Sequence, residues 1–230
     1  MLKQFGNKFL LSGDFHNTEA ENMMLLSCAF SICLTGIRVI YTGNILFVWL
    51  IWNLFLAFVP YAITRYGIRR PQLIKSNRKF IFIFISWLLF IPNSFYIITD
   101  LFHLRVRSVP LWFDLALILS FAWNGLLLGI LSMRQMEKMM EKKFNIANEW
   151  IFVYPMMLLN AFGVYVGRYL RFNSWDVFSN PFHLFNDIAY LIIHPIRNRF
   201  DWSMIFCYSV FMTLIYLTIK RLSKSLLNAS

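Results

Sequence analysis

Six long apolar runs dominate this chain, separated by short segments that carry most of its charge. A run of about 20 apolar residues is long enough for a helix to cross the roughly 30 Å hydrocarbon core of a bilayer. A helix also satisfies its own backbone hydrogen bonds within lipid. The sequence therefore predicts an all-α integral membrane protein with about six transmembrane helices in a single membrane domain. The predicted spans are residues 23–40, 45–64, 80–101, 111–133, 150–170 and 202–219, between tails at 1–22 and 220–230.

The composition excludes a soluble domain, because 59% of the residues are hydrophobic and only 14% are charged. The formal net charge of +11 would suit nucleic acid, but the positive-inside rule explains it better. Most of the 22 Lys and Arg residues lie in the two tails, between spans two and three, and between spans four and five. We therefore expect cytoplasmic N- and C-termini and the lipid bilayer as a partner, and no nucleic-acid partner.

The third predicted span, within Phe80–Leu104, ends in a polar stripe. Its members are spaced three, four and three residues apart: Asn93, Tyr96, Asp100 and His103. At these spacings they share one face of an α-helix. Because unsatisfied polar groups in lipid are costly, this face must meet protein or water. Pro92 leaves open whether the span is continuous or broken at this point.

Polar residues of two other spans should lie at the same depth. At about 1.5 Å per residue, a helix that enters the membrane at Phe80 reaches the far edge of the core near Asp100. The fourth span begins at that edge and the fifth ends there, and the segment 173–176 that follows is similar to a helix N-cap box. We therefore expect one cluster at the outer interface, made of Asp100, His103, Asp114, Arg168, Arg171 and Asp176.

Two small-residue motifs indicate which spans pack most closely. Gly125-x-x-x-Gly129 lies in the fourth span and Gly163-x-x-x-Gly167 in the fifth. Glycines at this spacing allow two helix backbones to approach each other. Since these spans also carry the polar residues, we expect spans three, four and five to form the inner bundle.

The segment between spans five and six predicts an interfacial amphipathic helix on the outer side, between Asn180 and Pro195. Proline is favoured in the first turn of a helix, as at Pro181, and Pro195 would end it. The residues between them separate into an apolar face (Leu184, Phe185, Ile188, Leu191 and Ile192) and a polar face (His183, Asp187, Tyr190 and His194). This pattern is typical of a helix lying in the membrane interface, which explains the two histidines better than a metal site does.

The connector between spans four and five, Arg134–Glu149, contains charges of both signs. We expect it to be a solvated helical extension on the cytoplasmic side.

Three motifs carry a resemblance to a known family. They are Pro92-Asn93-x-x-Tyr96-x-x-Thr99-Asp100-x-x-His103, then Trp112-Phe113-Asp114, then Gly167-Arg168-x-x-Arg171-x-Asn173-Ser174-Trp175-Asp176. In this order, over roughly 80–180, they resemble a bacterial multi-pass membrane family catalogued as domain of unknown function 1361. The resemblance implies a membrane location, with the bacterial plasma (inner) membrane as the expected site, and a shared motif set. It implies no activity.

Two kinds of chemistry are open for the carboxylates. Asp100, His103 and Asp114 are candidate catalytic residues, either as an acid/base pair or as ligands of a divalent metal, since Asp and His three apart on a helix can reach one ion. The alternative is structural, in which these side chains end their spans among hydrated head groups and cap neighbouring helices.

The arginines have two interpretations as well. Arg168 and Arg171 would form an anion clamp, because a guanidinium suits phosphate or carboxylate, including lipid-linked phosphate at this depth. The other interpretation is ion pairing with nearby aspartates. The further candidates for ligand binding are Asn93, Tyr96, Asn173 and Asp176.

Three functions remain as hypotheses. The first is an outward-facing membrane protein that binds or processes an anionic, lipid-linked or other extracytoplasmic substrate. The second is a non-enzymatic membrane subunit or scaffold in which the polar cluster only holds spans together. A transporter is less favoured, because none of the six spans carries a charge at mid-depth.

Overall fold

The computed structural model describes residues 18–105, 109–145, 148–172 and 176–228, and none of these lies in a strand. The all-α class predicted for this membrane protein is therefore confirmed. The helices are α2 (Thr18–Thr42), α3 (Trp49–Ile68), α4 (Pro71–Lys75), α5 (Asn77–Tyr96), the 3-10 helix η1 (Ile97–His103), α6 (Leu111–Phe144), α7 (Glu149–Arg168), α8 (Asp176–Ser179), α9 (Pro181–Ile193) and α10 (Arg199–Asn228).

Five helical segments in the described part of the chain are long and apolar enough to cross a membrane: Glu21–Thr42, Asn77–His103, Leu111–Phe144, Glu149–Arg168 and Arg199–Ser225. They coincide with five of the six predicted spans. The predicted second span coincides with α3, which is not among the five. Asn53, Arg65 and the Trp and Tyr residues lower the hydropathy of α3, yet one side of this helix is buried against α5 and α6.

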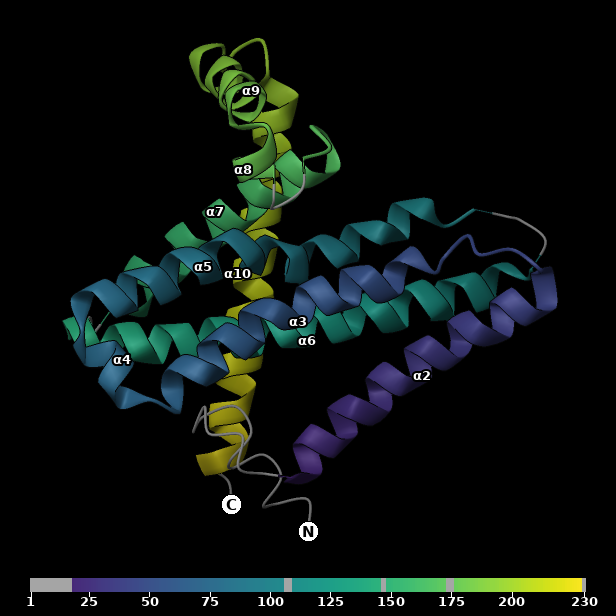
Figure 1. Ribbon diagram of the computed structural model, residues 1–230, viewed down its shortest axis with the longest axis horizontal. Helices are drawn as coiled ribbons and strands as arrows, with labels where there is room; N and C mark the ends of the chain where they lie inside the picture. Colours follow the sequence, from purple (N-terminus) through teal and green to yellow (C-terminus); the bar gives the residue numbers. More distant parts are fainter. Residues whose placement is uncertain (1–17, 106–108, 146–147, 173–175, 229–230) are drawn as a thin grey trace.

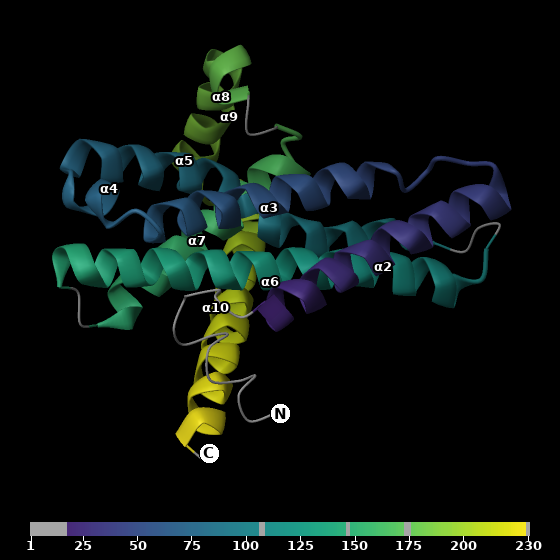
Figure 2. The same ribbon diagram turned by 60° about the horizontal axis from the view of Figure 1, so that its bottom comes forward.

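The helices form a layered arrangement and not a simple parallel bundle. α3 packs against both α5 and α6, and these three helices run along the long axis of the molecule (Figure 1). α2 lies obliquely against α6, and α7 packs between α5 and α10. α10 crosses steeply over the direction of α3 and α6 in both views (Figures 1 and 2). The predicted inner bundle of spans three, four and five therefore also includes α3.

The two glycine motifs face the same segment, residues 92–97 at the end of α5 and the start of the 3-10 helix η1, from opposite sides. A Cβ atom on Gly125 of α6 would lie 2.3 Å from Ile97 Cγ2, and one on Gly163 of α7 would lie 2.6 Å from Pro92 Cγ. Carbon atoms cannot approach so closely, so a side chain at either position would push the helices apart. The close packing predicted from these motifs is present, and the segment 92–97 is held between α6 and α7.

Gly125→Ala is expected to lower the free energy of unfolding by about 1–3 kcal/mol, the usual cost of overpacking. The matched control is Gly36→Ala in α2, where no atom lies within 4 Å of the added Cβ. There alanine should be neutral or stabilising by up to about 1 kcal/mol, because it favours helix more than glycine does. Thermal unfolding in detergent compares the two variants. A Gly125→Ala protein that melts at or above the wild-type temperature would contradict this packing.

The connector after span four continues as helix to Phe144, as predicted, but the expectation that it is solvated is wrong for Glu137. Glu137 is buried, and it accepts hydrogen bonds from Tyr216 Oη (2.5 Å) and Lys220 Nζ (2.7 Å) of α10. It also pairs with Arg134 one turn earlier. These contacts join α6 to α10, because the crossing of α10 brings its second half against this end of α6.

The amphipathic helix predicted between Asn180 and Pro195 is present as α9. Its Leu191 is buried against α7 and α10, while Phe182 and Phe185 are exposed. His183 Nδ1 lies 3.3 Å from Asp187 Oδ2 on the polar face. Exposed aromatic rings beside a polar face suit a helix at a membrane surface, and that location stays a prediction.

Candidate functional site

The centre of the candidate site is the change from α-helix to 3-10 helix at Ile97. α5 runs unbroken through Pro92 to Tyr96, and η1 follows without a gap. With about three residues per turn, side chains three apart lie directly above one another in a 3-10 helix. Two rows result, Ile97–Asp100–His103 and Tyr96–Thr99–Phe102. The polar stripe expected from α-helical spacing is thus divided between two adjacent rows.

Arg168, at the end of α7, contacts both rows. Its Nη2 donates to Asp100 Oδ1 at 2.6 Å and its Nε donates to Thr99 Oγ1 at 2.9 Å. Its Nη1 lies 3.0 Å from His103 Nε2, and since arginine only donates, this histidine nitrogen accepts. The guanidinium carbon lies 4.5 Å from the centre of the Tyr96 ring. Arg168 therefore joins α7 to the end of α5 and to η1.

Asp100 holds Arg168 in this position. Its side chain is fully buried, and its second oxygen, Oδ2, accepts from Asn53 Nδ2 of α3 at 3.0 Å. Both carboxylate oxygens are therefore engaged, one by a cation and one by an amide. A buried carboxylate needs such partners, because an uncompensated charge in the interior is costly.

Two cavities meet beside Arg168. The first, of about 390 Å³, is lined by Leu46, Phe47, Trp49, Asn53, Tyr96, His103 and Arg168. The second, of about 310 Å³, lies among α3, α5, α7 and α9, and most of its walls are apolar, including Leu56, Leu88, Leu159, Phe162, Val166 and Ile188. Asn53 and Tyr96 line both cavities. The two cavities thus adjoin at these two side chains. We call the first the polar cavity, because Arg168 and His103 line it, and the second the apolar cavity, because it has the longer row of aliphatic and aromatic side chains.

Asp114 does not join this cluster, and the predicted grouping is wrong at this residue. Its carboxylate forms an ion pair with Arg38 of α2, Nε to Oδ1 at 2.7 Å and Nη2 to Oδ2 at 3.2 Å. Among the residues that the structure describes, no three His, Cys, Asp or Glu side chains are grouped to hold a metal ion. Asp100, His103 and Asp114 therefore do not come together as one group, because each aspartate pairs with its own arginine.

The remaining predicted ligand residues are dispersed. Arg171 does not continue the face of Arg168, because α7 ends at Arg168 and Arg171 has a left-handed φ of 60° on an exposed turn. Asp176 begins α8 and accepts from Ser179 Oγ at 2.9 Å. Asn93 lines the apolar cavity and donates to Phe90 O of its own helix at 3.0 Å. Asn173 lies outside the described residues.

Sequence reasoning overlooked two residues that complete the site. Asn53 contacts Asp100, and Trp49 packs edge-to-face on His103 with ring centres 5.3 Å apart. Both are in the first turns of α3. An amide within an otherwise apolar span is itself a signal of an internal polar partner, so Asn53 could have been found from the sequence.

The comparisons with known proteins identify a family but no activity. A family model described as "Protein of unknown function (DUF1361)" matches residues 52–217, which is more than half of the chain. The match includes Asn53, η1 and Arg168. No curated protein and no solved structure matches the chain.

Proposed function

Because the chain belongs to the DUF1361 family, whose description states no activity, we propose its function from the geometry of the site. This membrane protein binds an amphiphile: Arg168 contacts an anionic head group, and the apolar cavity accepts the hydrocarbon part. The observation that carries the proposal is the junction of the two cavities at Asn53 and Tyr96. Ligand sites combine mostly apolar walls with a few placed polar groups in this way.

Arg168 supplies the anion contact. Its guanidinium has more N–H donors than its bonds to Thr99, Asp100 and His103 use. Its side chain is 13% exposed, whereas that of Asp100 is 0% exposed. The buried partner fixes the guanidinium, and the accessible part of the guanidinium lines the polar cavity. A fixed arginine fork suits phosphate and carboxylate, since little freedom is lost when it binds.

The contacts support binding more than acid/base catalysis. Asp100 has both oxygens engaged, and His103 Nε2 accepts from Arg168. Asp100 therefore acts as a positioning residue for Arg168. Trp49 and Tyr96 add aromatic walls to the polar cavity.

The proposed location is the outer face of a bacterial plasma (inner) membrane. It rests on the distribution of Lys and Arg, which gather at the opposite end of α3 and α5 from Arg168. An amphiphile at this level would place its head group at the outer interface and its chain among α3, α5 and α7.

The test compares dodecyl phosphate with dodecanol as probes of the purified protein in detergent. Wild type is expected to bind the phosphate more tightly. Arg168→Gln should weaken dodecyl phosphate binding by roughly 10- to 100-fold, as expected for a lost charge-assisted hydrogen bond. Leu88→Trp, which fills the apolar cavity, should weaken binding of both probes. Calorimetric titration of the folded fraction gives the affinities.

The matched control is Arg171→Ala, which removes an exposed cation from the same end of α7 and should leave binding unchanged. Equal weakening by Arg168→Gln and Arg171→Ala would show only general attraction of anions. If Arg168→Gln binds both probes as wild type does but melts at a lower temperature, the cluster is a structural clamp. The chain would then fit the alternative of a non-enzymatic membrane subunit.

A further inference from the structure

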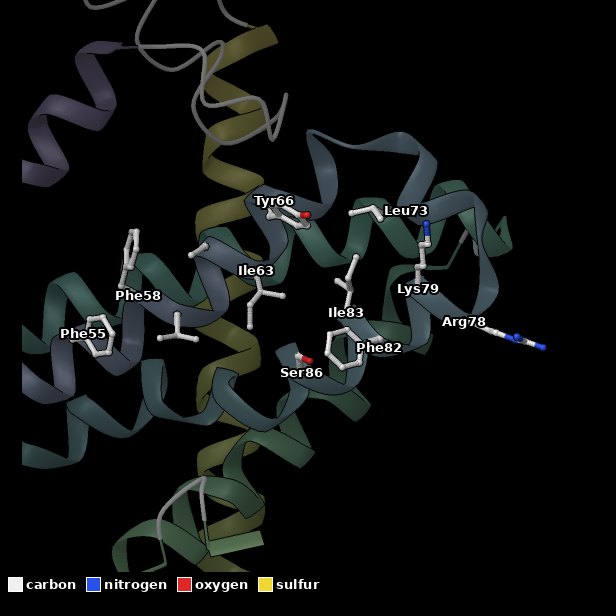
Figure 3. A pocket seen from close by; sticks show the side chains of 12 residues that line it. Phe55, Phe58, Ile63, Tyr66, Leu73, Arg78, Lys79, Phe82, Ile83 and Ser86 are labelled. Carbon is white, nitrogen blue, oxygen red and sulfur yellow. The ribbon is translucent and has the colours of Figure 1, made fainter. Parts of the chain in front are cut away.

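A third, larger cavity opens on the side of α3 and α5, at their other end. It has a volume of about 880 Å³, within the roughly 300–1,000 Å³ of ligand sites. Its walls come from α3, α4 and α5, as Figure 3 shows, and it shares no lining residue with the two cavities beside Arg168. We call it the α3/α5 groove. Its lining residues are Phe55, Phe58, Val59, Ala62, Ile63, Tyr66, Leu73, Arg78, Lys79, Phe82, Ile83 and Ser86.

The groove lies on a surface suited to hydrocarbon. Phe82 is 73% exposed and Phe55 is 53% exposed, and their neighbours Phe58 and Tyr66 are also exposed. Ile83 forms part of the floor and is buried. In a protein that spans a membrane, exposed aromatic and aliphatic side chains of this kind face lipid. The groove is therefore a hollow in a lipid-facing surface.

Among the described residues that line the groove, the cations lie at the end where α5 begins. Arg78 and Lys79 belong to the first turn of α5 and are exposed. Both cations line the groove, and Figure 3 shows Lys79 pointing toward Leu73 at its end, while the guanidinium of Arg78 extends outward from the same end. The segment 65–79 contains six basic residues and no acidic one. This end of the groove is therefore positive and the remainder is apolar.

We propose that the α3/α5 groove binds an anionic phospholipid, with its acyl chains along α3 and α5 and its phosphate at Lys79 and Arg78. Basic pockets between transmembrane helices on the cytoplasmic side suit anionic head groups, and the positive-inside rule puts this end in that leaflet. A helix from a second copy of the chain would fit the groove less well than a phospholipid does. Helix contacts in membranes are enriched in small residues, whereas Phe55, Phe58 and Phe82 line this groove.

The test uses the full chain purified in detergent and offered equal amounts of phosphatidylglycerol and phosphatidylcholine with identical acyl chains. Native mass spectrometry counts the lipids retained. Wild type is expected to retain phosphatidylglycerol in preference. Lys79→Ala should weaken its binding by about five-fold, and Arg78→Ala/Lys79→Ala by about 25-fold, as expected for membrane-surface cations.

Arg69→Ala is the matched control. It removes an exposed cation from the same basic segment, but Arg69 does not line the groove. It should change retention by less than about two-fold, since only a general surface potential is lost. Ser86→Phe fills the groove with every charge intact, and it should reduce phosphatidylglycerol retention.

Three results would overturn the proposal. They are equal retention of the two lipids by wild type, equal weakening by Arg69→Ala and Lys79→Ala, and full retention by a folded Ser86→Phe. The first requires no variant, so the test holds even if a substitution prevents folding. A cross-linked dimer through α3 and α5 in place of bound lipid would identify a second copy as the occupant.

Discussion

Arg38→Met is expected to lower the free energy of unfolding by about 3–5 kcal/mol, the cost of leaving a buried charge without its partner. The side chains of Arg38 and Asp114 are only 2% and 1% exposed. Arg38 donates two hydrogen bonds to the two oxygens of Asp114 and lies over the Phe47 ring at 4.5 Å. Without Arg38, the Asp114 carboxylate at the start of α6 would have neither countercharge nor water.

A second substitution tests that cause. In Arg38→Met/Asp114→Leu both charges are replaced by apolar groups, and such replacements of buried ion pairs are often neutral or stabilising. The double variant should therefore recover most of the stability lost in Arg38→Met. Thermal and denaturant unfolding in one detergent measures wild type, both single variants and the double. A double variant as unstable as Arg38→Met would show that packing of the arginine, not its charge, stabilises this contact.

Glu137→Leu is the second change with a large expected effect, also about 3–5 kcal/mol of destabilisation. Glu137 is the buried carboxylate that links α6 to α10 through Tyr216 and Lys220. Lys220 keeps Glu149 at 2.5 Å, but Arg134 and Tyr216 would lose their shared partner. The loss of stability should be concentrated in α10. This helix packs mainly on α7, and it is joined to α6 by its polar contacts with Glu137.

Hydrogen exchange of α10 tests that expectation more sharply than a melting temperature does. Amides of α10 should exchange faster in Glu137→Leu, while those of α3 and α5 should change little. Glu141→Leu is the control, since Glu141 is exposed one turn further along α6 and should cost less than about 0.5 kcal/mol. Uniformly faster exchange in all helices, or an equal effect of both variants, would contradict a role for Glu137 in holding α10.

The fold class and most of the long helices could be predicted from the sequence, because hydropathy depends on local composition. The apolar runs predicted helices at five segments that the structure shows to be long and apolar enough to span a membrane. Proline and asparagine at 180–181 predicted the start of α9. Glycines 125, 129, 163 and 167 predicted the close approach of α6 and α7 to α5. Each of these signals lies within one segment of the sequence, although the residues that the glycines contact lie in another.

The candidate site could be predicted from the sequence only in part. The sequence pointed to Asp100, His103 and Arg168 as polar residues at one level, and the structure brings these three together. The sequence also pointed to Asp114 and Arg171. Asp114 pairs with Arg38 instead, and Arg171 lies beyond the end of α7, off the helix face of Arg168. Depth can be estimated from the number of residues in a span. The rotation of each helix about its own axis, which decides what a side chain meets, cannot be estimated in this way.

The sequence by itself determined that this chain is an all-α membrane protein with polar groups at the ends of its apolar helices, since an apolar run of about 20 residues crosses a bilayer as a helix that satisfies its own backbone hydrogen bonds. Only the tertiary structure decided the partners of those groups. The glycine contacts set the rotation of α6 and α7 around α5, and the 3-10 turns of η1 separated the row of Asp100 and His103 from that of Tyr96. Arg168 meets Asp100 and Asp114 meets Arg38 because these packing contacts join residues distant in sequence.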